Sequence, residues 1–243
     1  MKVFYTYLSV LIILISGIHK IYATDVSGSI SSNTTWSLAE SPYVVTSSVT
    51  VDHGVTLNIE SGVTVRFDDG QNLYINGELN ATNVIFTSNN LSPYAGIWGY
   101  LQTGGSNTAD SGNVILNSCQ VLYATQFYVV NGTAELNGTD LSNFSNYGVY
   151  VETEGQFHMN GGNINTNSAG AGSWGSGVFG IVWSQIHLSN VNIQHFFKGI
   201  CLGNGAMVSI SDMDISNCTW PIYYNEAASL SVSGAFPVKE FAP

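Results

Sequence analysis

Apolar and polar residues alternate over short stretches along most of this chain, and the alternation returns at a nearly constant spacing. Each unit begins with two apolar residues separated by one other residue, and a further apolar residue follows five positions later. Alternation of period two is typical of β-strands with one buried face. The units are Val114-x-Leu116 with Val121, Ala134-x-Leu136 with Leu141, Phe157-x-Met159 with Ile164, Ile186-x-Leu188 with Ile193 and Val208-x-Ile210 with Ile215, and Leu230-x-Val232 begins another.

A second apolar pair recurs later in each unit, often directly after a glycine or a proline. From Leu116 to Val232 the successive units are 20, 23, 29, 22 and 22 residues long. The longest unit contains an insertion at residues 168–176. The second pairs are Phe127-x-Val129, Val149-x-Val151, Ile181-x-Trp183, Ile200-x-Leu202 and Ile222-x-Tyr224.

Such short strands, broken by Gly, Asn and Ser, cannot enclose a core alone, but stacked coils bury their apolar pairs against one another. The pattern therefore predicts an all-β parallel solenoid, with coils of about 20–23 residues and one longer coil. Asn143, Asn167 and Asn217 are expected at corners, because asparagine tolerates left-handed backbone and can form ladders between coils. A sandwich of short antiparallel strands is the alternative, and it does not explain the repeated offsets of two and five.

The region before these repeats fits the same plan with tighter corners. Residues 35–43 are expected to cap the open end of the solenoid, which would otherwise expose unpaired strand edges. Residues 24–243 are thus predicted to form one β-helix domain with an N-terminal cap near residues 24–50. Short apolar stretches separated by glycines lie at residues 49–51, 55–59, 63–67 and 73–75.

The chain opens with the features of a secretory signal peptide. Lys2 lies in the short N-terminal segment that precedes the apolar run of a signal peptide. Residues 8–18 form that apolar run, which is too short to span a bilayer comfortably, and Ala23 ends a cleavage-like site. We expect residues 1–23 to be removed and the mature protein to be secreted or held at the cell surface, with no membrane span after cleavage. An uncleaved anchor is the alternative; the early end of the apolar run favours cleavage.

One segment resembles a known group of proteins. The stretch GVTLNIESGVTVRF at residues 54–67, preceded by Thr35-Trp36 and Pro42-Tyr43, resembles the opening of right-handed β-helix domains in secreted or surface proteins of bacteria and archaea. These domains share the pectin-lyase-like fold. The resemblance implies export and a single-stranded right-handed parallel β-helix. It implies no particular activity, because that fold supports lyases, hydrolases, adhesins and plain scaffolds.

Charge restricts the partners of the mature domain. The chain has 5 Lys and Arg residues against 16 Asp and Glu, and only Arg66, Lys198 and Lys239 remain as strong bases after signal cleavage. An acidic surface of this kind repels nucleic acid, anionic membranes and polyuronates. The number of cysteines is three, which is odd, and the domain is large enough to fold without disulfide bonds, so no framework disulfide is expected.

The motifs of polysaccharide-processing enzymes with this fold are not recognisable. Polysaccharide lyases with this fold use an arginine or lysine base beside acidic calcium ligands. Arg66 and Lys198 each lack a basic partner at the same position of a neighbouring unit. Asp212 and Asp214 could form a carboxylate pair, but they fit a polar turn column better. The sequence therefore favours a non-enzymatic protein with no catalytic residue and no cofactor. A polysaccharide lyase or glycoside hydrolase, or a fragment of one, is the alternative.

In the first strand of each unit, the residue between the two buried positions is expected to face solvent. Three of these residues, Glu135, His158 and His187, would lie on successive coils about 4.8 Å apart. Two imidazoles and a carboxylate at that spacing could hold a borderline metal, but a solvated polar face without a metal is the favoured interpretation. The full column reads Ile115, Glu135, His158, His187, Ser209 and Ser231.

In the second strand, the corresponding outward column is rich in aromatic residues, which can stack on sugar rings. Trp174 lies beside it in the insertion and could fold over the column to form a shallow groove. The candidate carbohydrate-binding residues are Tyr128, Tyr150, Trp174 and Tyr223. Exposed tyrosines that simply suit β-strands are the alternative. The column reads Tyr128, Tyr150, Val182, Cys201 and Tyr223.

Taken together, these features predict a secreted or cell-surface interaction or structural module whose partner is a neutral polysaccharide or cell-surface glycan. Binding to ice or a mineral surface is a weaker hypothesis, because a regular Thr-x-Thr column is missing. The possibility that the chain is a fragment of a longer protein stays open.

Overall fold

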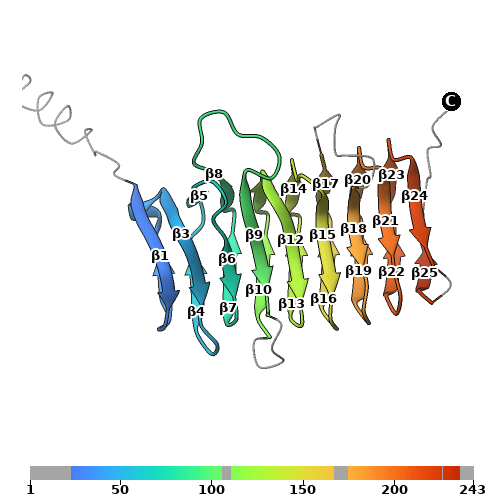
Figure 1. The fold of residues 1–243 in the computed structure, drawn as a ribbon, viewed down its shortest axis with the longest axis horizontal. Coiled ribbons are helices and arrows are strands. Elements are labelled where there is room, and N and C mark those ends of the chain that lie inside the picture. Colours follow the sequence, from blue (N-terminus) through green and yellow to red (C-terminus); the bar gives the residue numbers. More distant parts are fainter. Residues whose placement is uncertain (1–22, 106–110, 167–174, 226, 236–243) are drawn as a thin grey trace, which may run out of the picture.

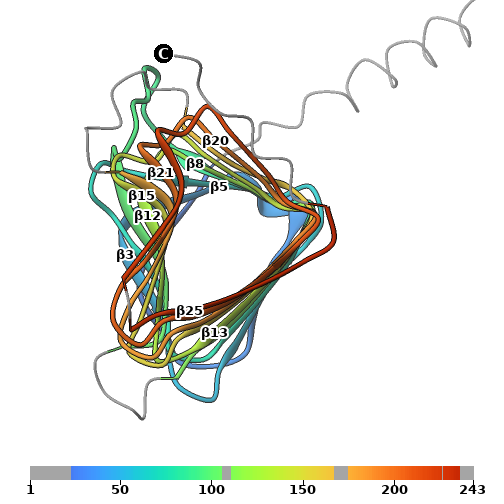
Figure 2. The same ribbon diagram turned by 90° about the vertical axis from the view of Figure 1, so that its right-hand side faces the viewer.

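The chain folds into a parallel β-solenoid, shown by a computed structural model that describes residues 23–105, 111–166, 175–225 and 227–235. About nine turns stack along one axis (Figure 1), and the cross-section of each turn has three sides (Figure 2). This confirms the predicted all-β, single-stranded right-handed parallel β-helix. The predicted signal peptide lies almost entirely outside the described residues.

Each complete turn contributes one strand to each of three faces. We name the faces after the strands of one coil, β10 (Asn113–Asn117), β11 (Gln120–Leu122) and β12 (Ala124–Val130). The β10 face is a nine-stranded parallel sheet of its own. Its other strands are β2 (Thr34–Trp36), β4 (Thr56–Ile59), β7 (Glu78–Thr82), β13 (Thr133–Asn137), β16 (Gln156–Asn160), β19 (Gln185–Ser189), β22 (Met207–Ser211) and β25 (Ser229–Ser233).

The other two faces are joined at the N-terminal end by the long strand β3 (Tyr43–Val51), which pairs with β1 (Thr24–Ile30), β5 (Thr64–Phe67) and β6 (Leu73–Ile75). The β11 face also contains β5 (Thr64–Phe67), β8 (Ile85–Ser88), β14 (Asp140–Ser142), β17 (Asn163–Asn165), β20 (Asn192–Gln194) and β23 (Asp214–Ser216). The β12 face also contains β6 (Leu73–Ile75), β9 (Trp98–Thr103), β15 (Tyr147–Glu152), β18 (Ser176–Gly180), β21 (Lys198–Leu202) and β24 (Trp220–Tyr224).

The repeat alignment from the sequence is confirmed on the β10 face. Leu116, Leu136, Met159, Leu188 and Ile210 pair in successive strands and are all buried. Parallel pairing without an offset places equivalent residues directly above one another, so each apolar position of the repeat becomes a continuous column in the core.

The second pair predicted for the longest coil is wrong. Ile181-x-Trp183 does not form a strand; the strand is β18, and Val178 pairs with Ile200 at the inward position. A Cβ atom on the next inward residue, Gly180, would lie 2.6 Å from Ile186 Cδ1, so a larger side chain there would require Ile186 to move. Val182 and Trp183 instead form an exposed turn with φ of 51° and 62°.

Corners of the coil use left-handed backbone, as expected for two of the three predicted asparagines. Asn143 and Asn217 have φ of 62° and 55°. The backbone N–H of Asn143 donates to the backbone carbonyl oxygen of Asn165 on the next coil. The third, Asn167, lies outside the described residues. Asparagine tolerates this conformation, so the chain can turn sharply without glycine at every corner.

The segment expected to cap the N-terminal end forms the first coil, with β1, β2 and the first part of β3 in the sheets. Trp36 and Tyr43 are buried there and stack with ring centroids 4.8 Å apart. The helical content of the described residues is a short 3-10 turn at Leu38–Glu40, and none of their helices has the length and apolar character of a membrane span. Cys119, Cys201 and Cys218 are buried free thiols.

The core column makes a testable prediction. Replacing Leu136 with Asp would place an unpaired carboxylate in the apolar interior, so we expect a loss of at least about 4 kcal/mol in the free energy of unfolding. Urea unfolding followed by circular dichroism measures this change. Asn137→Asp, which adds the same charge at an exposed position of the same strand, is the control. Equal stability of the two variants would contradict the alignment.

Candidate functional site

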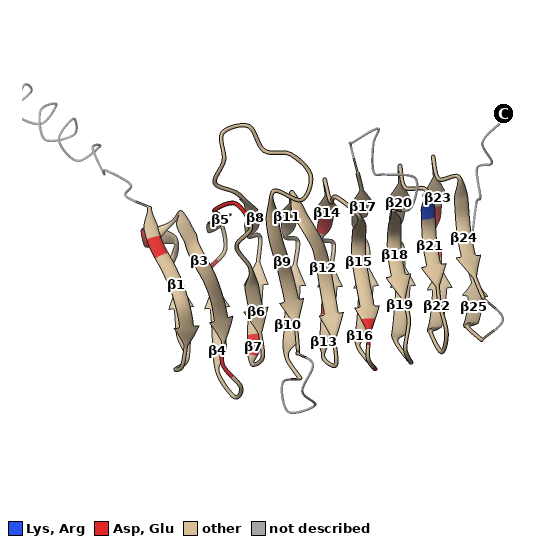
Figure 3. Ribbon diagram, in the orientation of Figure 1, with Lys and Arg blue, Asp and Glu red and all other residues tan. Residues whose placement is uncertain are grey.

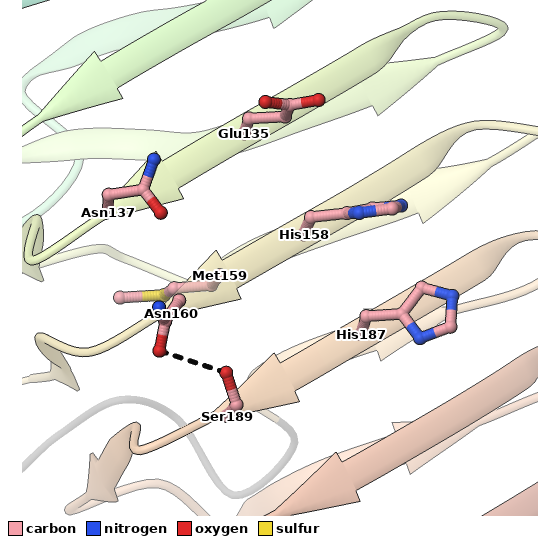
Figure 4. Close-up of a pocket in the computed structure, with 7 residues that line it drawn as sticks. All are labelled: Glu135, Asn137, His158, Met159, Asn160, His187 and Ser189. Atoms are coloured by element: carbon pink, nitrogen blue, oxygen red, sulfur yellow. Dashed lines mark hydrogen bonds between the residues drawn. The ribbon is translucent and has the colours of Figure 1, made fainter.

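Two outward surfaces of the solenoid carry the side chains singled out from the sequence. The first is the middle of the β10 face, where the predicted outward column is confirmed. Glu135, His158 and His187 come from three consecutive strands and project from the same side of the sheet (Figure 4). Ser209 and Ser231 continue the column on β22 and β25.

A shallow groove, which we call the polar groove, runs beside this column. One depression of about 320 Å³ lies over β13, β16 and β19, with Met159 at its floor. A second, of about 230 Å³, continues over β19, β22 and β25 and shares His187 and Ser189 with the first. The other polar residues of the first depression are Glu135, Asn137, His158 and Asn160.

The two histidines of the groove lie against each other. Their ring centroids are 4.8 Å apart with planes inclined by 66°. Partial burial, and then the neighbouring His187, lower the pKa of His158, whereas Glu135 acts in the opposite direction. His158 is therefore neutral near pH 7, and both of its ring nitrogens are suited to hydrogen bonding rather than to charge pairing.

The second surface is an aromatic strip on the β12 face. The register confirms that Tyr128, Tyr150, Cys201 and Tyr223 share one outward column. The place given to Val182 is wrong, because Phe179 pairs with both Tyr150 and Cys201. This follows from the shifted strand β18, whose glycine-rich sequence carries a weak apolar signal.

The rings of the strip stack on one another along the solenoid. Tyr128 and Tyr150 have centroids 5.0 Å apart and planes within 7°, and Tyr150 and Phe179 follow at 5.1 Å and 13°. Tyr147, which the sequence analysis did not single out, stacks on both Tyr150 and Phe179. Stacking covers the ring faces in the middle of the strip, so mainly ring edges face outward there.

Glu152 anchors the phenol groups of the strip. The hydroxyl of Tyr128 donates a hydrogen bond to Glu152 Oε1. Partial burial, followed by hydrogen bonding to this carboxylate, raises the pKa of both Tyr128 and Tyr150 well above 10.0. Both phenols are therefore protonated at any physiological pH, and their orientation is fixed by the shared carboxylate.

At its C-terminal end the strip changes character. Lys198 Nζ lies 4.0 Å from the centre of the Tyr223 ring, which is a cation–π contact, and Lys198 also interacts with the buried thiol of Cys201. The predicted apolar stretch around Cys201 is thus occupied by a lysine. Beyond it, Trp220 and Tyr223 on β24 are 52% and 48% exposed. Trp174, the fourth predicted residue, lies outside the described residues.

Both surfaces carry little charge. Lys198 lies on β21 of the β12 face, where Figure 3 shows a blue segment, and Arg66 lies on β5 of the β11 face. The polar groove contains one carboxylate, Glu135, and the aromatic strip contains Glu152 and Lys198. Among the described residues, no group of three or more His, Cys, Asp and Glu side chains is arranged to hold a metal ion.

Comparison with models of protein families, with curated proteins and with solved structures found no match to this chain. The solenoid fold alone does not specify a function. The chemistry of the polar groove and of the aromatic strip is therefore the basis for assigning one.

The groove geometry makes a prediction about metals. Glu135, His158 and His187 are spaced by one coil each, and an enclosing fourth ligand is missing from the depression. We expect no submicromolar binding of zinc or nickel at neutral pH, measured by calorimetric titration. Tight binding that disappears in a His158→Ala variant would contradict this expectation.

The anchored phenols make a second prediction. Because the folded-state pKa of Tyr128 and Tyr150 is raised above 10.0, their contribution to stability is present below pH 10 and is lost as the pH rises further. Removing the charge with Glu152→Gln should lower both pKa values toward 10.0. Phenolate absorbance during alkaline titration reports this change, with the exposed Glu154→Gln as control. Identical titration curves for the two variants would contradict the role of Glu152.

Proposed function

We propose that this protein is a non-enzymatic interaction module, secreted or held at the cell surface, which binds a neutral glycan at the β24 end of the aromatic strip. The observation that supports this proposal is the pair of exposed rings on β24. Tyr223 ends the column whose other rings cover one another, and Trp220 pairs with Lys198 beside it. An exposed aromatic face is the part of a protein that packs best against the apolar face of a sugar ring.

The lysine beside these rings adds polar recognition. The ammonium group of Lys198 lies over one face of Tyr223, and it can donate hydrogen bonds to sugar hydroxyls at the edge of that ring. The opposite face of Tyr223 is directed away from Lys198. A sugar on that face would contact the aromatic ring, while Trp220 on the same strand would contact a neighbouring sugar.

Charge favours a neutral ligand over an acidic one. The formal net charge of the chain is −11, so a polyuronate would be repelled at long range. A neutral polysaccharide meets no such barrier. Each ring–sugar contact is weak, and we expect dissociation constants of about 10 μM to 1 mM for a single site.

Non-enzymatic binding accounts for the carboxylates better than catalysis does. A glycosidase needs two carboxyl groups flanking the scissile bond, about 5 to 10 Å apart. Glu152 is hydrogen-bonded to the strip's own tyrosines, and Glu135 is the one carboxylate that lines the polar groove.

Binding of a panel of neutral polysaccharides tests the proposal. Trp220→Ala and Tyr223→Ala should each weaken binding about 10-fold, the effect of losing one stacked ring. Tyr94→Ala is the matched control, because Tyr94 is also an exposed aromatic residue but lies in the loop between β8 and β9. Trp174→Ala tests the fourth predicted residue. If no neutral glycan binds, or if both ring variants bind like the wild type, the proposal is wrong.

A further inference from the structure

The polar groove on the β10 face is separate from the aromatic strip, which lies on another side of the three-sided coil (Figure 2). Its two depressions share His187 and Ser189, so they form one continuous path across β13, β16, β19, β22 and β25. Five parallel strands about 4.8 Å apart give this path a length of about 19 Å along the solenoid axis. The groove therefore suits a linear ligand rather than a compact one.

Several polar side chains of the groove are held in place by hydrogen bonds to neighbouring coils. Asn137 Nδ2 donates to Asn117 Oδ1 at 3.0 Å, and Ser189 Oγ donates to Asn160 Oδ1 at 3.0 Å (Figure 4). A second donor, Asn190 Nδ2, reaches the same Asn160 oxygen at 3.1 Å. These bonds orient Asn137 Oδ1 and Asn160 Nδ2 as an acceptor and a donor that a ligand can use.

The histidine column adds further groups of the same kind. His187 Nδ1 is hydrogen-bonded to Ser209 Oγ, so Nε2 of the same ring points away from Ser209. His158 is held neutral near pH 7 by its lowered pKa. The groove thus offers neutral donors and acceptors on successive coils, with a single carboxylate at its β13 end.

We infer that the polar groove is a second saccharide site, which holds a neutral, hydroxyl-rich sugar chain along the solenoid axis by hydrogen bonds rather than by ring stacking. Amide, imidazole and hydroxyl groups match the alternating donors and acceptors of sugar hydroxyls. An anionic chain would meet Glu135 and the acidic field of the whole protein. The ligand class is that of the proposed function, but the residues and the face are different.

The preorganised geometry explains how so open a surface could bind at all. Side chains that are already fixed by neighbouring coils lose little conformational entropy when a ligand binds. Repetition along the axis also lets one chain contact several coils at once. Affinity should therefore rise with chain length until the chain spans about 19 Å, and then level off.

The experiment is a titration of the full chain, with labelled histidine, tryptophan and tyrosine side chains, using neutral β-linked oligosaccharides of increasing length. Histidine resonances report the groove, and tryptophan and tyrosine resonances report the strip. Ser189→Trp, which fills the position shared by the two depressions, should weaken groove binding at least 10-fold. His187→Ala should weaken it about 3- to 10-fold, as expected for one hydrogen bond.

Gln185→Ala is the matched control, because Gln185 is exposed on the same strand as His187 but does not line either depression. The groove is supported if His158 and His187 shift with ligand and the two groove variants alone lose that response. It is overturned if ligands shift only strip resonances, in which case the proposed function stands. Ligand shifts confined to the groove would instead overturn the strip, and no response at either surface would overturn both.

Discussion

The parallel hydrogen-bonded register between successive coils is the constraint on which the rest of this structure depends. Each strand pairs with its equivalent one coil earlier and one coil later, and within the repeat from β10 onward these pairings keep the same relative positions. A residue therefore has two neighbours of its own repeat position at a distance of one strand spacing. Core columns, corner ladders and both outward surfaces all arise from this one geometric rule.

That rule makes outward side chains interact first with one another. Tyr128, Tyr150 and Phe179 cover each other's faces, and Asn163 Nδ2 donates to Asp140 Oδ1 at 2.7 Å on the β11 face. Such ladders stabilise the stack, and they also remove groups from contact with solvent. On the aromatic strip, ring faces are then open only where the ladder is interrupted, as at Cys201, where a small residue allows Lys198 to reach Tyr223.

Much of this fold could be predicted from the sequence, because with this register the spacing between residues along the chain determines where each lies on the coil. The column of Glu135, His158 and His187 followed directly from the offsets in the repeat, and so did the buried column of Leu136. The longest coil could not be aligned in this way. Its strand β18 has glycine at two of five positions, so the pair Ile181 and Trp183, which lies in the following turn, carried the stronger apolar signal. In the structure, β18 places Val178 at the inward position, and Gly180 packs closely against Ile186.

Side-chain conformation was a second limit on prediction. Spacing placed Tyr128 and Tyr150 in one column, but it could not show that their ring faces are covered, that Glu152 binds their hydroxyls, or that Tyr147 turns outward to join them. This matters for function, because a column of aromatic residues offers ring faces only where stacking ends. The same reasoning separates the two surfaces. Polar side chains line the groove on β13, β16, β19, β22 and β25, whereas the exposed rings of the aromatic strip, Trp220 and Tyr223, lie on the single strand β24. On our proposals, the groove therefore suits a long ligand and the end of the strip suits a short one.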